Sequence, residues 1–440
     1  MEMLEKKQMK RRIIGSVLMS LLTLGAMAQI SSTLSPYSQF GLGTLSDQSQ
    51  GFNRAMGGLA IGLRDGRQVN MQNPASYSAI DSLTMVFDLG VSGQLTNFKE
   101  GSKKINAKTA DFDYVVALFR VLPKLGMSVG IVPYSNIGYD YYNTQFVGES
   151  NTYYTTETHK GEGGFNQGFL GLGLELFRGF SLGANISYLW GDYTKSVSVV
   201  SSDTYVNTIM KSYTASVSTW KLDAGAQWQM RLGKKDVMTI GATAGIGHKL
   251  GAQADLSIVN TNSQTSVSTM TTDSVANGLS IPFTFGGGIS VVHDNQLTIG
   301  ADYTLQKWGD LAFPQVQEST NRYKSMHGLL TDRHKVTVGA DWLPTSLSSR
   351  RKFFSLIHYR IGASYATPYY KIHGQDGPKE LSVSAGFGIP ILNSWNNRST
   401  LNISAQWSHV SADNFVTENT FRINIGLTFN ERWFAKWKVD

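Results

Sequence analysis

Residues 36–80 read PYSQFGLGTLSDQSQGFNRAMGGLAIGLRDGRQVNMQNPASYSAI, and this stretch differs in pattern from the chain that follows it. Glycines are spread through it, and no apolar repeat of 2 or 3.6 residues persists, so we expect compact irregular chain with one helical turn near Phe52–Leu59. From Leu83 onward, apolar and polar residues alternate in segment after segment. An irregular, glycine-rich piece before a long series of strands predicts a plug inside a closed sheet.

The alternation after residue 82 has the period of a β-strand. In Leu83–Gly93 the odd-numbered residues up to Val91 are apolar and most residues between them are polar, and Thr420–Phe429 alternates in the same way. Such runs are about as long as the tilted strands that cross a bilayer. The sequence therefore predicts an all-β fold: a transmembrane antiparallel β-barrel of about 14 strands over residues 83–429, with an N-terminal hatch, residues 29–82, inside its lumen.

The expected strands are joined by short and long connections in turn. Long loops are expected at Asn143–Gly164, Lys195–Lys211, Gly251–Asn277 and Gly309–Arg333, which is typical of outer-membrane barrels with short periplasmic turns. An even number of strands places both ends of the barrel on the periplasmic side. We expect strands near Leu83–Phe98, Ala110–Val121, Lys124–Tyr139, Phe165–Phe177, Gly179–Thr194, Ser212–Leu232, Asp236–Leu250, Gly278–Val292, Gln296–Trp308, His334–Leu343, Leu356–Tyr370, Glu380–Ile389, Thr400–Val410 and Thr420–Phe429.

A soluble β-sandwich would also alternate, and three features favour the membrane barrel over it. The polar face carries charges of both signs, among them Asp88, Asp302 and Arg360, which suits a wet or plugged lumen. Aromatic residues cluster at strand ends, as in the girdles of membrane barrels. Closure also satisfies every backbone group, which lipid demands. The aromatic residues at strand ends are Tyr139, Tyr141, Tyr142, Tyr188, Trp190, Trp220, Trp228, Trp308, Trp342, Tyr369, Tyr370 and Trp407.

The two ends of the chain have their own patterns. Residues 1–28 have a basic start, an apolar run from Ile13 to Met27 and the small-x-small sequence Ala26-Met27-Ala28, which predicts a signal peptide; an uncleaved anchor helix is the alternative. Its removal lowers the net charge from +7 to +4, which argues against a nucleic-acid partner. Residues 430–440 follow the final strand and are expected to form a periplasmic tail.

Motifs for chemistry are scarce, so we expect no enzyme activity, no cofactor and no metal. The chain has no cysteine, and its eight histidines show neither an H-x-x-x-H nor an HExxH spacing. Gly286-Gly287-Gly288 is followed by no Lys-Ser/Thr, so it predicts close packing or a bend rather than a phosphate loop. A third alternative, an outer-membrane lipase, rests only on the closeness of His409 and Ser411 in the sequence.

Two short motifs in the hatch carry a resemblance. Gly51–Gly58 (GFNRAMGG), followed by Asn73–Tyr77 (NPASY), resembles the hatch of the FadL/TodX family of outer-membrane transporters of hydrophobic compounds such as long-chain fatty acids. Here Asn-Pro-Ala is followed by Ser-Tyr, where that family more often has Gly-Leu. Independently of the resemblance, proline holds Asn73 extended and the asparagine side chain can cap the turn, so an ordinary Asn-Pro turn is the alternative.

The resemblance implies a function and a set of site residues. It implies uptake of a hydrophobic small molecule across the outer membrane of a Gram-negative bacterium, with release sideways into the outer-membrane lipid. The hatch turn Asn73, Pro74 and Ala75 and the third-strand residues Pro133 and Gly138 then serve ligand binding or gating. Proline removes a donor from a strand ladder, and a proline merely tolerated near the strand's end is the equal alternative at Pro133.

A second function is implied by the same resemblance. Some members of that family are accessory barrels of a protein-export system of the type IX secretion kind, with a periplasmic or export-system protein as partner. An apolar pocket in the lumen would favour transport, whereas a filled lumen with a large extracellular patch would favour the accessory role. For transport, an apolar patch that first captures the ligand is expected from Tyr153, Tyr154, Leu311, Phe313, Leu329 and Leu330 in the long loops.

Overall fold

The computed structural model describes residues 35–82, 84–147, 152–317, 322–344, 353–391 and 399–432. The expected signal peptide lies outside the described residues, as does the expected tail from residue 433 onward. Within these ranges, no helix is long and apolar enough to cross a membrane. The two ends of the barrel wall are Thr84 and Arg432, which lie in paired strands.

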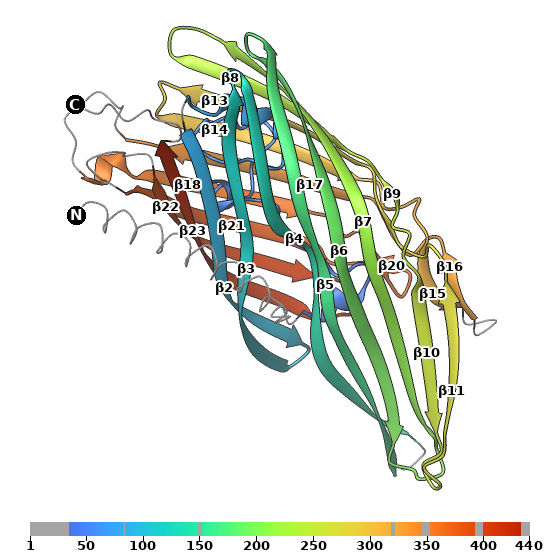
Figure 1. The fold of residues 1–440 in the computed structure, drawn as a ribbon. Coiled ribbons are helices and arrows are strands. Elements are labelled where there is room, and N and C mark those ends of the chain that lie inside the picture. Colours follow the sequence, from blue (N-terminus) through green and yellow to red (C-terminus); the bar gives the residue numbers. More distant parts are fainter. Residues whose placement is uncertain are drawn as a thin grey trace, which may run out of the picture.

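Within the described ranges, fourteen antiparallel strands form a closed barrel, which confirms the predicted fold class (Figure 1). Each strand pairs with its neighbours along the chain, and the barrel closes where the first, β2, pairs with the last, β23. Strand number and order match the expectation from the sequence. The wall strands are β2 (Thr84–Glu100), β3 (Lys103–Leu122), β4 (Leu125–Val147), β5 (Tyr153–Phe177), β6 (Phe180–Ser201), β7 (Thr208–Arg231), β8 (Asp236–Gly245), β13 (Thr284–His293), β14 (Leu297–Gln306), β17 (Arg333–Trp342), β18 (His358–Ala366), β21 (Lys379–Pro390), β22 (Thr400–Ser411) and β23 (Thr417–Arg432).

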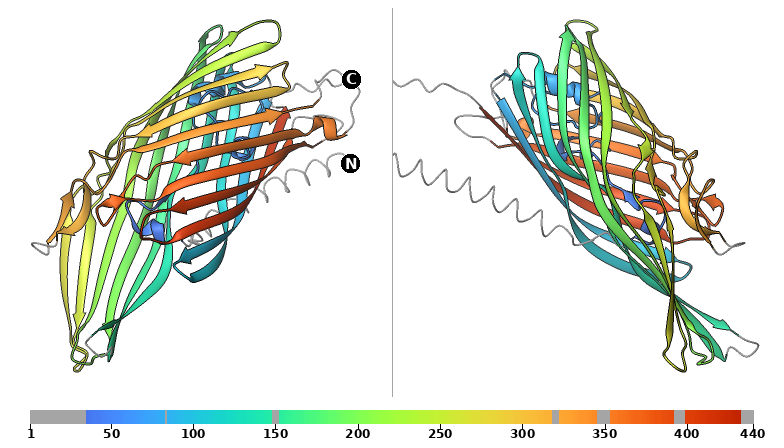
Figure 2. Two further views of the ribbon diagram at one scale, coloured as in Figure 1. Left: turned by 180° about the vertical axis from the view of Figure 1, so that it is seen from behind. Right: turned by 45° about the vertical axis from the view of Figure 1, so that its right-hand side comes forward.

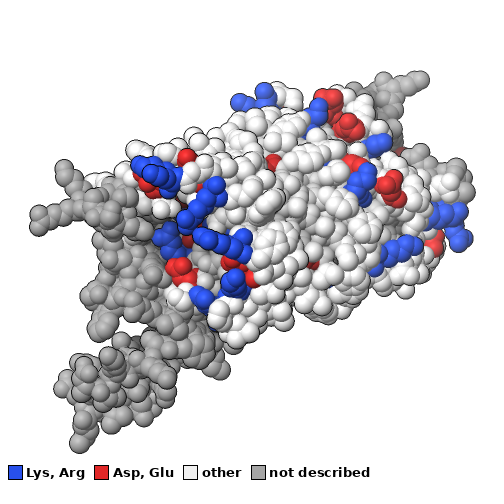
Figure 3. Space-filling view, turned by 90° about the horizontal axis from the view of Figure 1, so that it is seen from above, with Lys and Arg blue, Asp and Glu red and all other residues white. Residues whose placement is uncertain are grey.

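The wall has a polar inside and an apolar outside, as the alternation predicts. On β2, Asp88, Ser92 and Gln94 are buried toward the lumen, whereas Val91 and Leu95 are exposed on the outer surface. Charged side chains gather toward the two ends of the molecule, and the surface between them is mostly uncharged (Figure 3). An apolar band between two charged ends is the surface that a bilayer requires.

Three of the four segments expected to be long loops are largely strand, and the fourth, Gly309–Arg333, holds a short hairpin. β4 to β7 continue well past the barrel, and β10 (Ala254–Thr261) and β11 (Ser268–Val275) pair onto β7 to complete a six-stranded sheet, hereafter the extension. Figure 2 shows it running beyond the other strands. The prediction was wrong here because the sequences are rich in Ser and Thr on both faces. Beyond the apolar core at the mouth, the residues on both faces of the extension are partly or fully exposed, so little alternation marks the strands.

A small hairpin covers part of the extension's outer edge. β15 (Phe313–Gln317) pairs with β16 (Arg322–Met326), and the N–H of Tyr323 donates to Asp273 of β11 at 3.0 Å. This hydrogen bond lowers the pKa of Asp273. The hairpin is therefore held to β11 by a hydrogen bond to an ionised carboxylate.

The aromatic residues at strand ends do not all form a girdle. Trp220, Trp228, Trp342 and Trp407 are exposed on the outer wall as expected. Others, expected at the lipid interface, are buried in a core under the extracellular mouth, where Trp308 is only 1% exposed. The girdle prediction was wrong for these, because alternation gives the face of a strand but not what covers that face. The buried ones are Tyr139, Trp308, Tyr369 and Tyr370.

The hatch fills the lumen and contacts the wall where the wall has glycines. Its elements are η1 (Pro36–Gln39), β1 (Thr44–Leu45), α2 (Gly51–Arg54) and η2 (Pro74–Ala79). A Cβ on Gly362 would lie 2.0 Å from the carbonyl carbon of Met56, and one on Gly288 would lie 2.8 Å from the Cβ of Ile61. Glycine therefore lets hatch and wall approach closely, and the close packing expected for the three-glycine run is found at Gly286 and Gly288.

We predict that Gly362→Ala lowers the unfolding temperature of the barrel, because the added methyl group must displace hatch backbone. Overpacking of this kind costs about 1–3 kcal/mol. Gly287→Ala is the matched control, since nothing lies within 4 Å of a Cβ at that position of β13. The measurement is heat-dependent mobility on a gel together with circular dichroism. Equal unfolding temperatures for the two variants would contradict close hatch packing.

Candidate functional site

The wall splits between β3 and β4. Their ladder runs from Leu122 and Leu125 up to Val115 and Ile131 and has no pairs beyond that point. Just above it, β4 bulges against β5 between Pro133 and Ser135. The structure thus has a break in the third wall strand where Pro133 predicts one. Its role in moving a ligand stays a prediction.

Hatch residues occupy this split and take the place of β3 beside β4. β1 pairs with Ser135 and Asn136. The N–H of Ser46 donates to the carbonyl of Tyr134 at 3.0 Å, and the N–H of Ser35 donates to the carbonyl of Gly138 at 2.8 Å. The side chain of Gln48 donates to the carbonyl of Pro133 at 2.8 Å. Pro133 and Gly138 are therefore brought together with the hatch, which seals the gap that they border.

The hatch turn Asn73–Pro74–Ala75 lies elsewhere, against the inner faces of β5, β6 and β7. The Asn73 side chain accepts from the N–H of Ala75 at 3.2 Å and donates to the carbonyl of Ile61 at 2.8 Å. A Cβ on Gly183 would lie 2.4 Å from the carbonyl carbon of Pro74. The five predicted site residues thus form two groups, and the Asn-Pro-Ala group is a packed and capped turn.

A buried ion pair fastens the middle of the hatch. Arg54 of α2 lies 2.5 Å from Asp113 of β3 and donates to Asn424 of β23 at 3.1 Å. Its guanidinium also lies over the ring of Tyr114, whose hydroxyl accepts from the N–H of Gly51 at 2.6 Å. Arg54 therefore joins the hatch to β3 and to β23, the two neighbours of β2 at the point where the barrel closes.

A wall carboxylate fixes the next part of the hatch. Asp302 of β14 accepts from the N–H groups of Ala60 at 2.6 Å, Ile61 at 2.8 Å and Gly62 at 3.4 Å. A carboxylate with several backbone donors is strongly held in a buried site. The sequence marked Asp302 as a lumen charge but gave no sign of its hatch partners, because residues 60–62 lie far from it along the chain.

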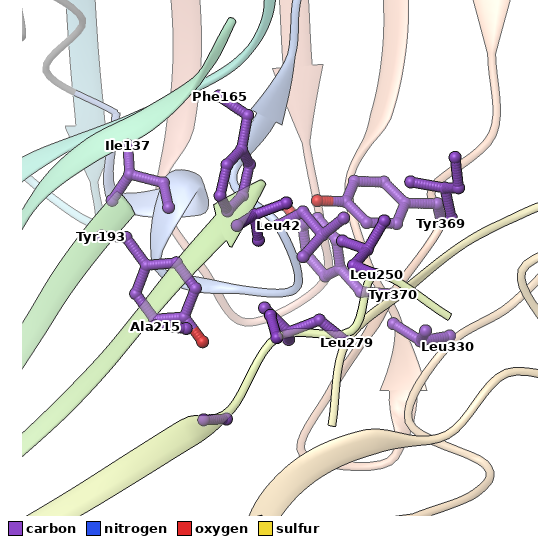
Figure 4. Packing of buried hydrophobic residues seen from close by; sticks show 14 of the residues in the cluster. Leu42, Ile137, Phe165, Tyr193, Ala215, Leu250, Leu279, Leu330, Tyr369 and Tyr370 are labelled. Atoms are coloured by element: carbon purple, nitrogen blue, oxygen red, sulfur yellow. The ribbon is translucent and has the colours of Figure 1, made fainter. Parts of the chain in front are cut away.

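The extracellular mouth is closed by an apolar core. Leu42 of the hatch lies among residues from the wall and the extracellular loops, including Phe165, Tyr193, Leu279 and Tyr369 (Figure 4). Nearby, the buried Lys195 donates to the carbonyls of Gln39 at 2.9 Å and Gly41 at 2.8 Å. Leu330 belongs to this core, and Leu311 and Phe313 pack on it. These three loop residues therefore do not form the expected capture patch.

A cavity of about 200 Å³ lies between the hatch and the inner faces of β2, β3, β4, β17, β18, β21, β22 and β23. Asp47, Arg54 and Asp113 line it, together with Arg333 and Glu380, so it is strongly charged. No group of three or more His, Asp or Glu residues in the described ranges is placed to hold a metal. His409 lies beside Asn419, with 2.9 Å between its ring nitrogen and the amide oxygen.

Comparison with known proteins places the chain. The BamG family model matches residues 9–440. The chain belongs to the BamG family. No curated protein matches its sequence. The FadL/TodX resemblance predicted from the hatch motifs is supported for the fold, while the matching family carries a different name.

Solved structures similar to this chain include hydrocarbon channels and a FadL homologue. The toluene transporter TodX of Pseudomonas putida is 14% identical over 90% of this chain and 100% of its own, with a TM-score of 0.59. A Pseudomonas aeruginosa FadL homologue is 12% identical over 89% and 99%, with a TM-score of 0.60. The monoaromatic hydrocarbon channel CymD is 14% identical over 90% and 99%, with a TM-score of 0.55. At these identities the likeness shows the fold alone.

We predict that a cysteine at Ala60 stays unreactive toward a membrane-impermeant maleimide added to intact cells, because Ala60 is 0% exposed inside the lumen. Tyr205→Cys is the control, since Tyr205 is 82% exposed on the extension. Labelling at both positions at similar rates would mean that the hatch leaves the lumen in the membrane.

Proposed function

We propose that this BamG-family barrel is an accessory barrel of a protein-export system in the Gram-negative outer membrane, and that it binds a protein partner through its extension. The observation that carries this proposal is the filled lumen. An apolar core closes the mouth, buried polar contacts hold the hatch, and the cavity of about 200 Å³ between hatch and wall is lined by charged side chains. Sites for hydrophobic small molecules are usually larger, and their walls are mostly apolar.

The far end of the extension supplies a surface for a partner. Phe146 is 65% exposed and packs edge-on against Tyr154, with 6.3 Å between ring centroids. Tyr205 and Met270 are also largely exposed. Aromatic and methionine side chains are enriched at protein interfaces, so the exposed side chains of these types support a binding surface at this end of the extension.

We predict that a photoreactive phenylalanine analogue at Phe146 crosslinks in cells to one discrete protein. Tyr154→Glu in the same chain should lower the yield of that adduct about tenfold, because a charge beside a buried aromatic anchor removes a hot spot. The same analogue at Trp228, exposed on the lipid-facing wall, is the control and should give no such adduct. Absence of any protein adduct from Phe146, Tyr205 and Met270 would overturn the accessory role.

A second candidate function is transport of a hydrophobic small molecule with lateral release. One observation favours it: the β3–β4 ladder ends at Val115 and Ile131, directly below Pro133. Release at that level would spare the ligand a passage through water, where each exposed CH₂ costs about 0.8 kcal/mol. It requires the hatch segment beside β4 to move away.

We predict that Pro133→Val tests this route. Valine restores a backbone donor and favours an unbroken strand, so uptake of a radiolabelled fatty acid or toluene by cells should fall if the split is the exit. Barrel heat resistance should hold or rise. Unchanged uptake by the Pro133→Val variant with a folded barrel would remove Pro133 from the route. If cells with the native protein take up no more ligand than a strain that lacks it, the accessory role is left.

A further inference from the structure

β2 and β3 are joined at their extracellular ends, and this end of the pair is called here the β2–β3 hairpin. Three lysines share its outward face. Lys99 and Lys104 lie directly opposite each other in the β2–β3 register, and Lys108 follows on the same face opposite Leu95. All three lysines are exposed. The hairpin thus carries a compact basic patch beside the outer surface of the barrel.

This arrangement is electrostatically unfavourable by itself. Like charges placed directly opposite each other on one face of a sheet destabilise the pair. The ladder partners nearest the patch are neutral: Asn97 donates to Asn106 at 2.7 Å on this face, and Thr417 of β23 lies beside Lys99. Glu100 is opposite Lys103 in the next pair of the ladder, whose side chains point to the other face. An anion on the outward face would relieve the repulsion.

The level of the patch identifies the source of that anion. Directly below the lysines, Val91, Leu95 and Phe112 are exposed on the apolar outer wall, each between 42% and 43%. Farther down, where β3 and β4 part, a groove of about 720 Å³ opens on the outside. Its lining is almost wholly apolar and includes Val115, Ile131, Gly168, Leu170, Tyr188 and Trp220.

We propose that the outward face of the β2–β3 hairpin binds a phosphate-bearing lipid of the outer leaflet. Lys99, Lys104 and Lys108 hold the phosphate, and the acyl chains run down over Leu95 and Phe112 toward the groove at the base of the split. Charge and apolar surface occur here in the vertical order of an anionic lipid, headgroup above and chains below. The inference is independent of whether the barrel transports a ligand or binds a protein.

The test uses the purified full-length mature barrel in detergent, titrated with lipid A that carries two phosphates and followed by native mass spectrometry. Lys99→Gln, Lys104→Gln and Lys108→Gln together should weaken binding roughly 100-fold, since each lysine beside an anionic lipid surface contributes about fivefold. The control combines Lys124→Gln, Arg178→Gln and Lys234→Gln, three exposed cations on the short turns at the other end. It changes net charge equally and should leave binding unchanged.

Two further probes separate the sources of phosphate. Dephosphorylated lipid A should bind as weakly to the native chain as lipid A binds to the triple hairpin variant. Inorganic phosphate at millimolar concentration should not displace lipid A, and displacement would mean a free-anion site instead. Equal lipid A binding by the native chain and the hairpin variant, each with a heat-resistant barrel, would overturn the proposal. If the hairpin variant then lost a protein crosslink, the patch would be a protein-binding surface.

Discussion

Above Ile131, β4 pairs with a wall strand on one side only, because β5 continues beside it while the ladder to β3 has ended, and this one vacancy determines much of the structure. Unpaired N–H and C=O groups at the edge of the lipid region are costly, so the gap must be filled by protein. The hatch fills it with β1 and with the backbone of Ser35 and Ser46. The hatch therefore completes the wall as well as occupying the lumen, and its position is tied to strand pairing.

Polar contacts hold the hatch to the inner wall of the barrel, and the loss of any one of them would strongly destabilise the fold. Breaking a buried ion pair such as Arg54–Asp113 by removing one partner costs about 3–5 kcal/mol, because the other charge stays buried and unpaired. Asp302 would lose three backbone donors if residues 60–62 moved. The apolar core around Leu42 adds the cost of exposing that side chain at the mouth. These contacts act at three levels of the barrel, so the hatch is held along its length.

Sequence reasoning succeeded where one face of a strand meets lipid and failed where it does not. The wall strands were found because their lipid-facing side must be apolar. Successive side chains of a strand point to opposite faces, so apolar residues recur at every second position. The extension was missed because both of its faces are exposed beyond the apolar core at the mouth. Buried aromatics such as Trp308 were placed on the outside because alternation says nothing about a loop folding over the mouth. Contacts such as Ser35 to Glu418, 383 residues apart, leave no local signal.

The predicted site residues show the same division between local and non-local signals. Pro133 is a local signal, since a proline weakens any ladder wherever it stands, and a break does lie there. What fills the break is a non-local fact that no local pattern encodes. In the lipid region each group on β4 that lost its hatch partner would cost about 1–3 kcal/mol if left unsatisfied. The same groups cost much less where water reaches them. Opening the split therefore requires water or another strand at the level of Tyr134–Gly138. This requirement distinguishes a sealed accessory barrel from a transport channel more sharply than the fold does.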